Sequence, residues 1–172
     1  VPGSKSITNR AMLLAALTNG DCLLKNALFS SDSRALLAAL QALGIRCDAD
    51  ENTKEIKITG CGGFLPNKSA TVYAASAGTA ARFLTALLAF CDGTYILDAS
   101  EQMKKRPMAP LIDAIHSIGI SVTALEEEGH LPLRIEGKRS QLISAPELSV
   151  SIDRSSQFLS ALMMTGILLP DG

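Results

Sequence analysis

The chain has 172 residues, 47% of them hydrophobic, which is enough to bury the core of one or two domains. Its formal net charge is −1, from 16 basic and 17 acidic residues, so there is no global positive field of the kind that attracts nucleic acid or an anionic membrane. Aromatic residues are only 4% of the chain and tryptophan is absent, which excludes the stacking platforms of a single-strand binder. Any binding of an anion must therefore depend on a local cluster of charge.

The spacing of the cysteines and the length of the apolar runs further limit the class of protein. There is no C-x-x-C pair and no histidine doublet near a cysteine, so the spacing of a zinc site is absent. A core this rich in aliphatic residues does not need disulfides, and we expect reduced thiols and a cytoplasmic protein. The longest apolar runs, residues 11–17 and 83–91, fall far short of the roughly 20 residues that span a bilayer. The chain does not begin with Met, and we expect further sequence upstream.

The first predicted element is a helix that begins after a Pro-Gly pair and enters an aliphatic segment at residues 11–17. Ser4 or Ser6 can cap its first turn, and Lys5 and Arg10 bring positive charge to a helix end whose free N–H groups already favour an anion. Ser6 and Arg10 are one turn apart and share a face. The segment predicts a site for a phosphate or a carboxylate. It is not a P-loop, because the Gly-Lys-Ser/Thr order and the earlier loop glycine are missing.

This helix start recurs twice along the chain. The pattern consists of small polar residues, followed by Arg or Gln and then by an aliphatic helix. It is found around Arg10, Arg82 and Gln157, at intervals of 72 and 75 residues. A second amphipathic helix recurs in phase, at residues 33–43 and 107–118, and each copy is followed by a glycine suited to a left-handed C-cap. The sequence therefore predicts an internal structural repeat.

Predicted strands fit between the repeated helices. They are residues 22–25 and 94–97, and two hairpins, 45–47 with 55–59 and 120–124 with 131–135. The repeated unit is β-α-β-α-β-β with a period near 75, which predicts an α/β fold. We expect one incomplete domain with units at residues 1–68 and 69–146 and a truncated third unit at 147–172.

Four polar motifs mark the helix starts and loops of this repeat. They are Pro-Gly-Ser-Lys-Ser-x-x-x-Arg at 2–10, Ser-Ala-Gly-Thr-Ala-Ala-Arg at 76–82, Lys-Lys-Arg-Pro at 104–107 and Ser-Ser-Gln-Phe-Leu at 155–159. In this order, and over nearly the whole chain, they resemble the motifs of the EPSP synthase (3-phosphoshikimate 1-carboxyvinyltransferase) family. The resemblance implies two similar domains of three such units, with helices inside and sheets outside. This chain would be part of the first domain, and the second domain would lie outside it.

The resemblance also implies an activity. It is the transfer of the enolpyruvyl group of phosphoenolpyruvate to the 5-hydroxyl of 3-phosphoshikimate, with release of phosphate and without metal or organic cofactor. The implied ligands of 3-phosphoshikimate are Lys5, Ser6, Arg10, Ser155, Ser156 and Gln157, and those of phosphoenolpyruvate are Lys5, Gly78, Arg106 and Gln157. Lys5 and Arg106 are the expected catalytic residues, acting on charge that develops in the transition state. Nucleic acid and membranes are not expected partners, and the longer parent enzyme is expected to be a monomer.

The residue types in these motifs fit such anionic ligands. Gly78 lets a ligand approach the backbone closely, because no side chain intervenes. Pro107 fixes the backbone beside Arg106 at an expected helix start, and a guanidinium can grip a carboxylate or phosphate with two parallel hydrogen bonds. Lys104 and Lys105 are interpreted as a solvated face, and His116 and His130 as structural or surface residues. One departure from the family is Ser76, where many relatives carry Asn, which bears on inhibitor sensitivity.

Two other functions fit the same residues. A related transferase acting on a UDP-sugar shares the architecture, although its reactive cysteine loop has no clear counterpart in this chain. A non-catalytic anion-binding module made of these repeats is the second alternative. By the resemblance, the groups for acid–base chemistry lie in the second domain, so this chain alone is expected to be inactive.

Overall fold

The computed structural model describes residues 3–141, 147–153 and 155–169. Its helices are α1 (Lys5–Leu17), α2 (Ser31–Ala42), α3 (Gly78–Ala89), α4 (Glu101–Lys104), α5 (Ala109–His116) and α6 (Gln157–Thr165), with 3-10 turns at Arg139–Gln141 and Gly166–Leu168. Its strands are β1 (Asp21–Leu24), β2 (Arg46–Asp50), β3 (Glu55–Thr59), β4 (Ser69–Tyr73), β5 (Gly93–Asp98), β6 (Ser121–Ala124) and β7 (Leu133–Gly137).

These strands form two sheets, in the orders β1-β3-β2 and β4-β5-β7-β6. In the first sheet β3 is antiparallel to both of its neighbours, and in the second β7 is antiparallel to both of its own. The order β1-β3-β2 thus recurs as β5-β7-β6, and β4 adds a parallel strand beside β5. The α/β fold of repeated β-α-β-α-β-β units is confirmed, and so are the two predicted hairpins.

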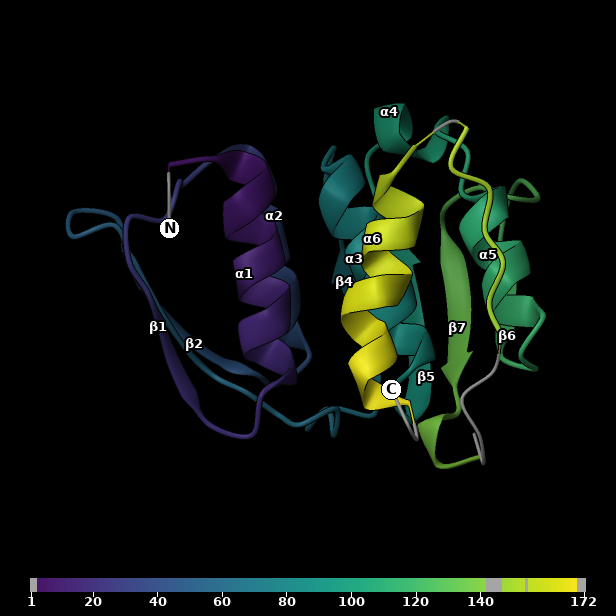
Figure 1. Ribbon diagram of the computed structural model, residues 1–172. Helices are drawn as coiled ribbons and strands as arrows, with labels where there is room; N and C mark the ends of the chain where they lie inside the picture. The colour runs from purple at the N-terminus through teal and green to yellow at the C-terminus, as the bar shows by residue number, and fades with distance from the viewer. Residues whose placement is uncertain (1–2, 142–146, 154, 170–172) are drawn as a thin grey trace.

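The helices α1, α2, α3 and α6 lie between the two sheets, as Figure 1 shows. Every one of the twelve residues of α3 is buried, so this helix is surrounded by protein on all sides. Its aliphatic and aromatic side chains join residues of both sheets in one continuous core. Burial of this apolar surface is the main source of stability of the fold. In Figure 1, α1 and α6 both begin at the upper end of the molecule, the end at which α4 lies.

The helix ends differ in a way that bears on function. At the start of α2, Ser30 and Ser33 form a reciprocal capping box. The N-cap of α1 is Ser4, but no side chain caps this helix, so the predicted capping by a Ser4 or Ser6 hydroxyl is wrong. The N-cap of α3 is Ala77, which also makes no side-chain hydrogen bond. The N–H groups in the first turns of α1 and α3 therefore stay available to a ligand.

The two glycines predicted to end the second helix of each unit do so. Gly44 follows α2 with φ +85°, and Gly119 follows α5 with φ +83°. Both angles lie in the left-handed region, where a side chain is disfavoured. The start of α5 differs from the expectation, because the helix begins at Ala109 and not at Pro107. The short helix α4, which the sequence pattern did not predict, occupies the preceding segment.

Candidate anion-binding site

The first cationic residue of the site, Lys5, begins α1 and pairs with an acidic residue of α2. Its Nζ atom lies 3.1 Å from Oδ2 of Asp32, with the Lys5 side chain 49% exposed and the Asp32 side chain 18% exposed. Asp32 had no role in the sequence interpretation, and this pairing gives it one. The carboxylate holds the ammonium group at the end of the helix, while half of the lysine side chain remains open to solvent.

Arg10 joins three helices. Its Nη1 atom donates to the carbonyl oxygen of Ser6 at 3.1 Å, and its Nη2 atom donates to Oγ of Ser160 in α6 at 3.2 Å. The guanidinium also lies over the ring of Phe83 in α3, 5.5 Å from its centroid. The predicted shared face of Ser6 and Arg10 is present, although Arg10 contacts the Ser6 carbonyl and the Ser6 side chain is left exposed. Arg10 is thus fixed at the junction of α1, α3 and α6.

The start of α6 presents three polar side chains. Oγ of Ser155 accepts a hydrogen bond from the backbone N–H of Gln157 at 3.2 Å, which leaves the Ser155 hydroxyl proton available to another acceptor. Ser156 is exposed, and Gln157 is partly buried. The Gln157 side chain turns toward α3, where its Oε1 atom accepts from Nη1 of Arg82.

Two guanidinium groups converge on Gly78, the first residue of α3. A Cβ atom placed on this glycine would lie 3.0 Å from Nη1 of Arg106 and 3.1 Å from Nη1 of Arg82, so both groups lie close above its α-carbon. Arg82 is only 8% exposed. Burial lowers the pKa of Arg82, and the nearby charge of Arg106 lowers it further. Two cations this close, beside the open N–H groups of a helix start, favour an anion between them.

Arg106 is positioned by a different element from the helix start that was expected at Pro107. Its backbone N–H donates to the carbonyl of Met103 at 3.0 Å, so the last turn of α4 positions it and Pro107 does not start a helix. Beside it, Oγ of Ser76 lies 2.8 Å from Oγ of Ser100, the N-cap of α4. The loop before α3 is therefore tied to α4, with Ala75 at φ +50°.

Of the predicted site residues, the structure brings Gly78, Arg106 and Gln157 together around Arg82. It connects Arg10 to α6, and it places Lys5 and Ser6 at the start of α1, at the same end of the molecule as the start of α6. Sequence reasoning placed Arg82 in the repeat but did not name it as a site residue. Its position, equivalent to Arg10 and Gln157, was the signal that it belongs to the site.

The interpretation of Lys104 as a solvated residue is wrong. Its side chain is 16% exposed, and its Nζ atom lies 3.6 Å from Asp98, 3.3 Å from Glu101 and 3.1 Å from Glu126. The hydrogen bond with Glu126 is the main reason that the pKa of Lys104 is raised. These carboxylates neutralise Lys104, so it does not add to the field of the site. Lys105 is exposed, as predicted.

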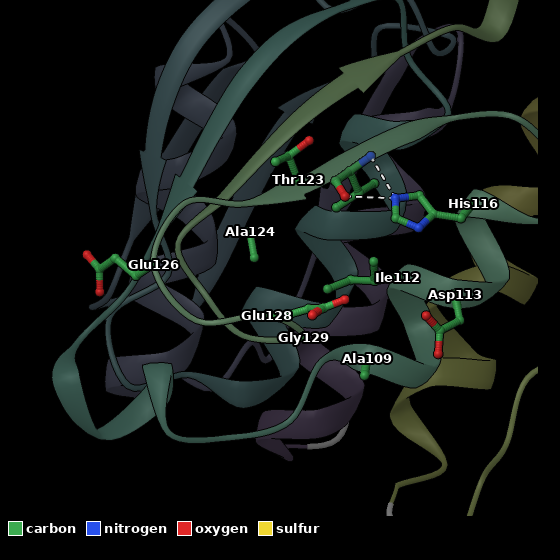
Figure 2. Close-up of a pocket in the computed structure, with 10 residues that line it drawn as sticks. Ala109, Ile112, Asp113, His116, Thr123, Ala124, Glu126, Glu128 and Gly129 are labelled. Atoms are coloured by element: carbon green, nitrogen blue, oxygen red, sulfur yellow. Dashed lines mark hydrogen bonds between the residues drawn. The ribbon is translucent and has the colours of Figure 1, made fainter.

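A groove of about 800 Å³ lies elsewhere, between α5, β6 and the turn that follows β6. Figure 2 shows the acidic residues Asp113, Glu126 and Glu128 around it, together with His116. Nε2 of His116 lies 2.7 Å from the carbonyl oxygen and 3.1 Å from the backbone nitrogen of Val122, which gives this histidine the structural role predicted. None of the predicted anion ligands lines the groove, and its carboxylates would repel an anion.

The described residues contain neither a metal-binding cluster nor a membrane-spanning helix. In residues 3–141, 147–153 and 155–169, no group of three or more His, Cys, Asp or Glu side chains is arranged to hold a metal ion. No helix of the described chain is long and apolar enough to cross a membrane. All four cysteines are free thiols, and burial raises the pKa of Cys47 to about 11.

The chain is similar to curated proteins that are named 3-phosphoshikimate 1-carboxyvinyltransferase. The 3-phosphoshikimate 1-carboxyvinyltransferase of Trichormus variabilis is 42% identical over 164 residues, which are 95% of this chain and 38% of that protein. The enzyme of the same name from Ralstonia nicotianae is 44% identical over 164 residues, which are 95% of this chain and 37% of that protein. The chain therefore spans less than two fifths of the length of these relatives.

A solved structure and a family model complete the comparison. The structure of EPSP synthase from Acinetobacter baumannii superposes with a TM-score of 0.85 and 24% identity, over 98% of this chain and 37% of that one, which supports the fold. The family model described as EPSP synthase (3-phosphoshikimate 1-carboxyvinyltransferase) matches residues 1–172. With a match over its whole length and relatives above 40% identity, the chain belongs to the EPSP synthase family.

Proposed function

We propose that this chain is the part of an EPSP synthase that binds 3-phosphoshikimate and one side of phosphoenolpyruvate. The observation that carries the proposal is the convergence of Arg82 and Arg106 on Gly78, with Gln157 attached, in a protein whose net charge is only −1. A local cluster of cations at uncapped helix starts is suited to ligands that carry several negative charges.

The proposed ligands divide between the two substrates. Around the phosphate and hydroxyls of 3-phosphoshikimate we place Lys5, Ser6, Arg10, Ser155, Ser156 and Gln157, and around phosphoenolpyruvate we place Lys5, Gly78, Arg106 and Gln157. Arg10 is supported by its fixed place between α1 and α6. The Ser155 hydroxyl is supported by its free proton, since its oxygen already accepts from the Gln157 backbone.

The proposed reaction is an addition followed by an elimination. C3 of phosphoenolpyruvate gains a proton, and the 5-hydroxyl of 3-phosphoshikimate loses its proton and attacks C2 to give a tetrahedral intermediate. This intermediate then loses a proton from C3 as it expels phosphate, which restores the carbon–carbon double bond. Lys5 and Arg106 would stabilise the negative charge on the phosphate and carboxylate of phosphoenolpyruvate during these steps. The pairing of Lys5 with Asp32 orients the ammonium group before the substrate arrives.

We also propose how the chain fits into a larger domain. Exposed apolar side chains follow one face of α1 (Ile7, Leu14) and the segment from α6 into the turn after it (Leu159, Met163, Ile167). Apolar surface of this extent favours burial, and we propose that the remainder of a third unit covers it. The three units would be residues 1–68, 69–146 and 147 onward.

The residues of the proposed site support an enzyme that needs a second domain for activity. The chain alone would then be inactive. Its site residues supply cations, hydroxyls and an amide, and we place the acid–base groups in the other domain. The four free thiols support a reducing compartment, and we propose a cytoplasmic, monomeric enzyme.

A titration of the chain with 3-phosphoshikimate tests the proposal. Calorimetry or NMR should detect weak binding, on the order of millimolar, because most ligands of that substrate lie on this chain but solvent still screens them. Shikimate without its phosphate is the control and should bind more weakly. Failure to bind 3-phosphoshikimate, or tighter binding of a UDP-sugar, would overturn the proposal. Turnover by a longer protein that includes these residues distinguishes an enzyme from a non-catalytic binding module.

A further inference from the structure

Arg82 is an unusual residue for the interior of a protein. It stands in the middle of the all-buried helix α3, and its guanidinium lies over the ring of Phe158 in α6, 4.9 Å from the centroid. Its Nε atom is buried without a hydrogen-bond partner. Within the described chain no carboxylate offsets its charge, and the charge that acts on it is the positive one of Arg106. A buried, uncompensated cation is costly to the fold, so stability alone does not explain Arg82.

Its contact with Gln157 fixes the orientation of an amide. The Arg82 guanidinium has only donors, so the Gln157 atom that faces it must be the carbonyl oxygen Oε1. The other end of the amide, the Nε2 group, is then a pure donor that points away from Arg82. Gln157 is only partly buried and belongs to the start of α6, where we place both substrates. Without Arg82 the amide is free to rotate by 180° and present its oxygen, which repels an anion.

We propose that Arg82 is a positioning residue, which holds the Gln157 amide with its NH₂ group directed at an oxygen of the anionic substrate. The proposal rests on the function proposed above and deepens it, because it assigns Gln157 the role of a donor only. Gly78 is part of the arrangement, since its missing side chain leaves the space that the Arg82 guanidinium occupies. Arg82 thereby acts on the substrate through Gln157.

A double-mutant cycle on the 172-residue chain tests this role. Arg82→Met keeps an unbranched side chain over Phe158, and Gln157→Ala removes the amide. Each single variant should weaken binding of 3-phosphoshikimate roughly tenfold, the scale of one hydrogen bond to a charged group. The double variant should also lose roughly tenfold, not a hundredfold, because both changes remove the same donor. Full additivity, or unchanged binding in Arg82→Met, would overturn the proposal.

The matched control is Arg139, a second arginine stacked on a phenylalanine. Its guanidinium lies 4.6 Å from the centroid of Phe64 and donates to the carbonyls of Gly62 and Leu168, away from the proposed ligands. Arg139→Met should lower stability and leave 3-phosphoshikimate binding unchanged. If it weakened binding as much as Arg82→Met, the effect would be a general loss of structure and the proposal would fail.

A readout without ligand separates this proposal from the function on which it rests. In an NMR spectrum of the ¹⁵N-labelled chain, the side-chain NH₂ signals of Gln157 should shift in Arg82→Met, while those of Gln41, which donates to the Cys47 carbonyl at 2.9 Å, should not. A shift supports positioning even if the chain does not bind 3-phosphoshikimate. Unchanged Gln157 signals would overturn it. If Arg82→Met does not fold, Arg82→Leu, which also lacks a donor, replaces it with the same expected results.

Discussion

Adding one methyl group at Gly78 should weaken ligand binding without lowering the stability of the fold. The Cβ atom of Gly78→Ala would lie 3.0 Å from Nη1 of Arg106 and 3.1 Å from Nη1 of Arg82, closer than ordinary van der Waals contact, while Sδ of Met103 at 3.8 Å is not disturbed. Both close neighbours are the ends of long side chains, so they can move by a few tenths of an ångström. The φ angle of Gly78 is outside the left-handed region, so alanine fits the backbone without strain.

The size of each effect follows from these contacts. A hydrogen bond from a guanidinium to an anion contributes about 1.5–3 kcal/mol, and displacing two guanidiniums weakens such bonds without abolishing them. We expect a loss of about 1–1.5 kcal/mol in binding of phosphoenolpyruvate, or roughly tenfold in Kd. Stability should hold or rise by up to about 1 kcal/mol, since alanine is a better helix residue than glycine.

The measurement is a phosphoenolpyruvate titration combined with urea unfolding of the same samples. Gly166→Ala is the matched control, because its Cβ atom would meet nothing within 4 Å at the end of α6. The control should leave phosphoenolpyruvate binding as it is. Unchanged affinity in Gly78→Ala would refute the placement of the anion beside these guanidiniums. A marked loss of stability would refute the argument that the two side chains can move aside.

Four further outcomes are expected. Arg10→Ala should weaken 3-phosphoshikimate binding by about 1.5–3 kcal/mol, and calorimetry showing full affinity in a folded variant would contradict it. In a longer enzyme that includes these residues, Lys5→Met or Arg106→Met should lower kcat by on the order of 10²-fold and raise KM for phosphoenolpyruvate; a near-normal kcat removes that residue from catalysis. The 172-residue chain should release no phosphate from the two substrates, which is contradicted by turnover that follows the chain through chromatography. Burial raises the pKa of Cys47 to about 11, so the folded protein keeps a proton that the unfolded chain releases near its ordinary value of 9.0. Cys47 should therefore contribute a fall of about 2 kcal/mol in the free energy of unfolding between those values, and Cys47→Ala should remove that part of the pH dependence in urea titrations; an equal slope would refute it.

The repeat and the fold were predictable because their signals are local. Each of these signals occupies a few neighbouring residues: the helical periodicity, the glycines after α2 and α5, and the alternation of apolar and polar residues in β3. Their recurrence in phase strengthened each prediction. The helix α4 was missed because four residues are too few to show a period. Without α4, the sequence pattern gave Arg106 the wrong anchor.

Long-range partners account for the rest of the errors. Lys104 looked solvated because one of its carboxylate partners, Glu126, is 22 residues away. Arg82 received no role because its partner Gln157 is 75 residues away, in another helix. Spacing within one helix cannot reveal such contacts. The phase of the repeat was the one signal in the sequence that related Arg82 to Gln157.

The complete burial of α3 has a consequence for how ligand binding can be observed. All residues of this helix are buried, so the amide hydrogens beyond its first turn exchange with solvent only when large parts of the molecule unfold. Gly78 and Arg82 belong to this helix, and a ligand held at its start stabilises the folded state as a whole. The slowest-exchanging amides of the protein therefore report on an anion bound at its surface. Binding of a weak ligand that changes no conformation is therefore still detectable, as slower hydrogen exchange of amides in the centre of the core.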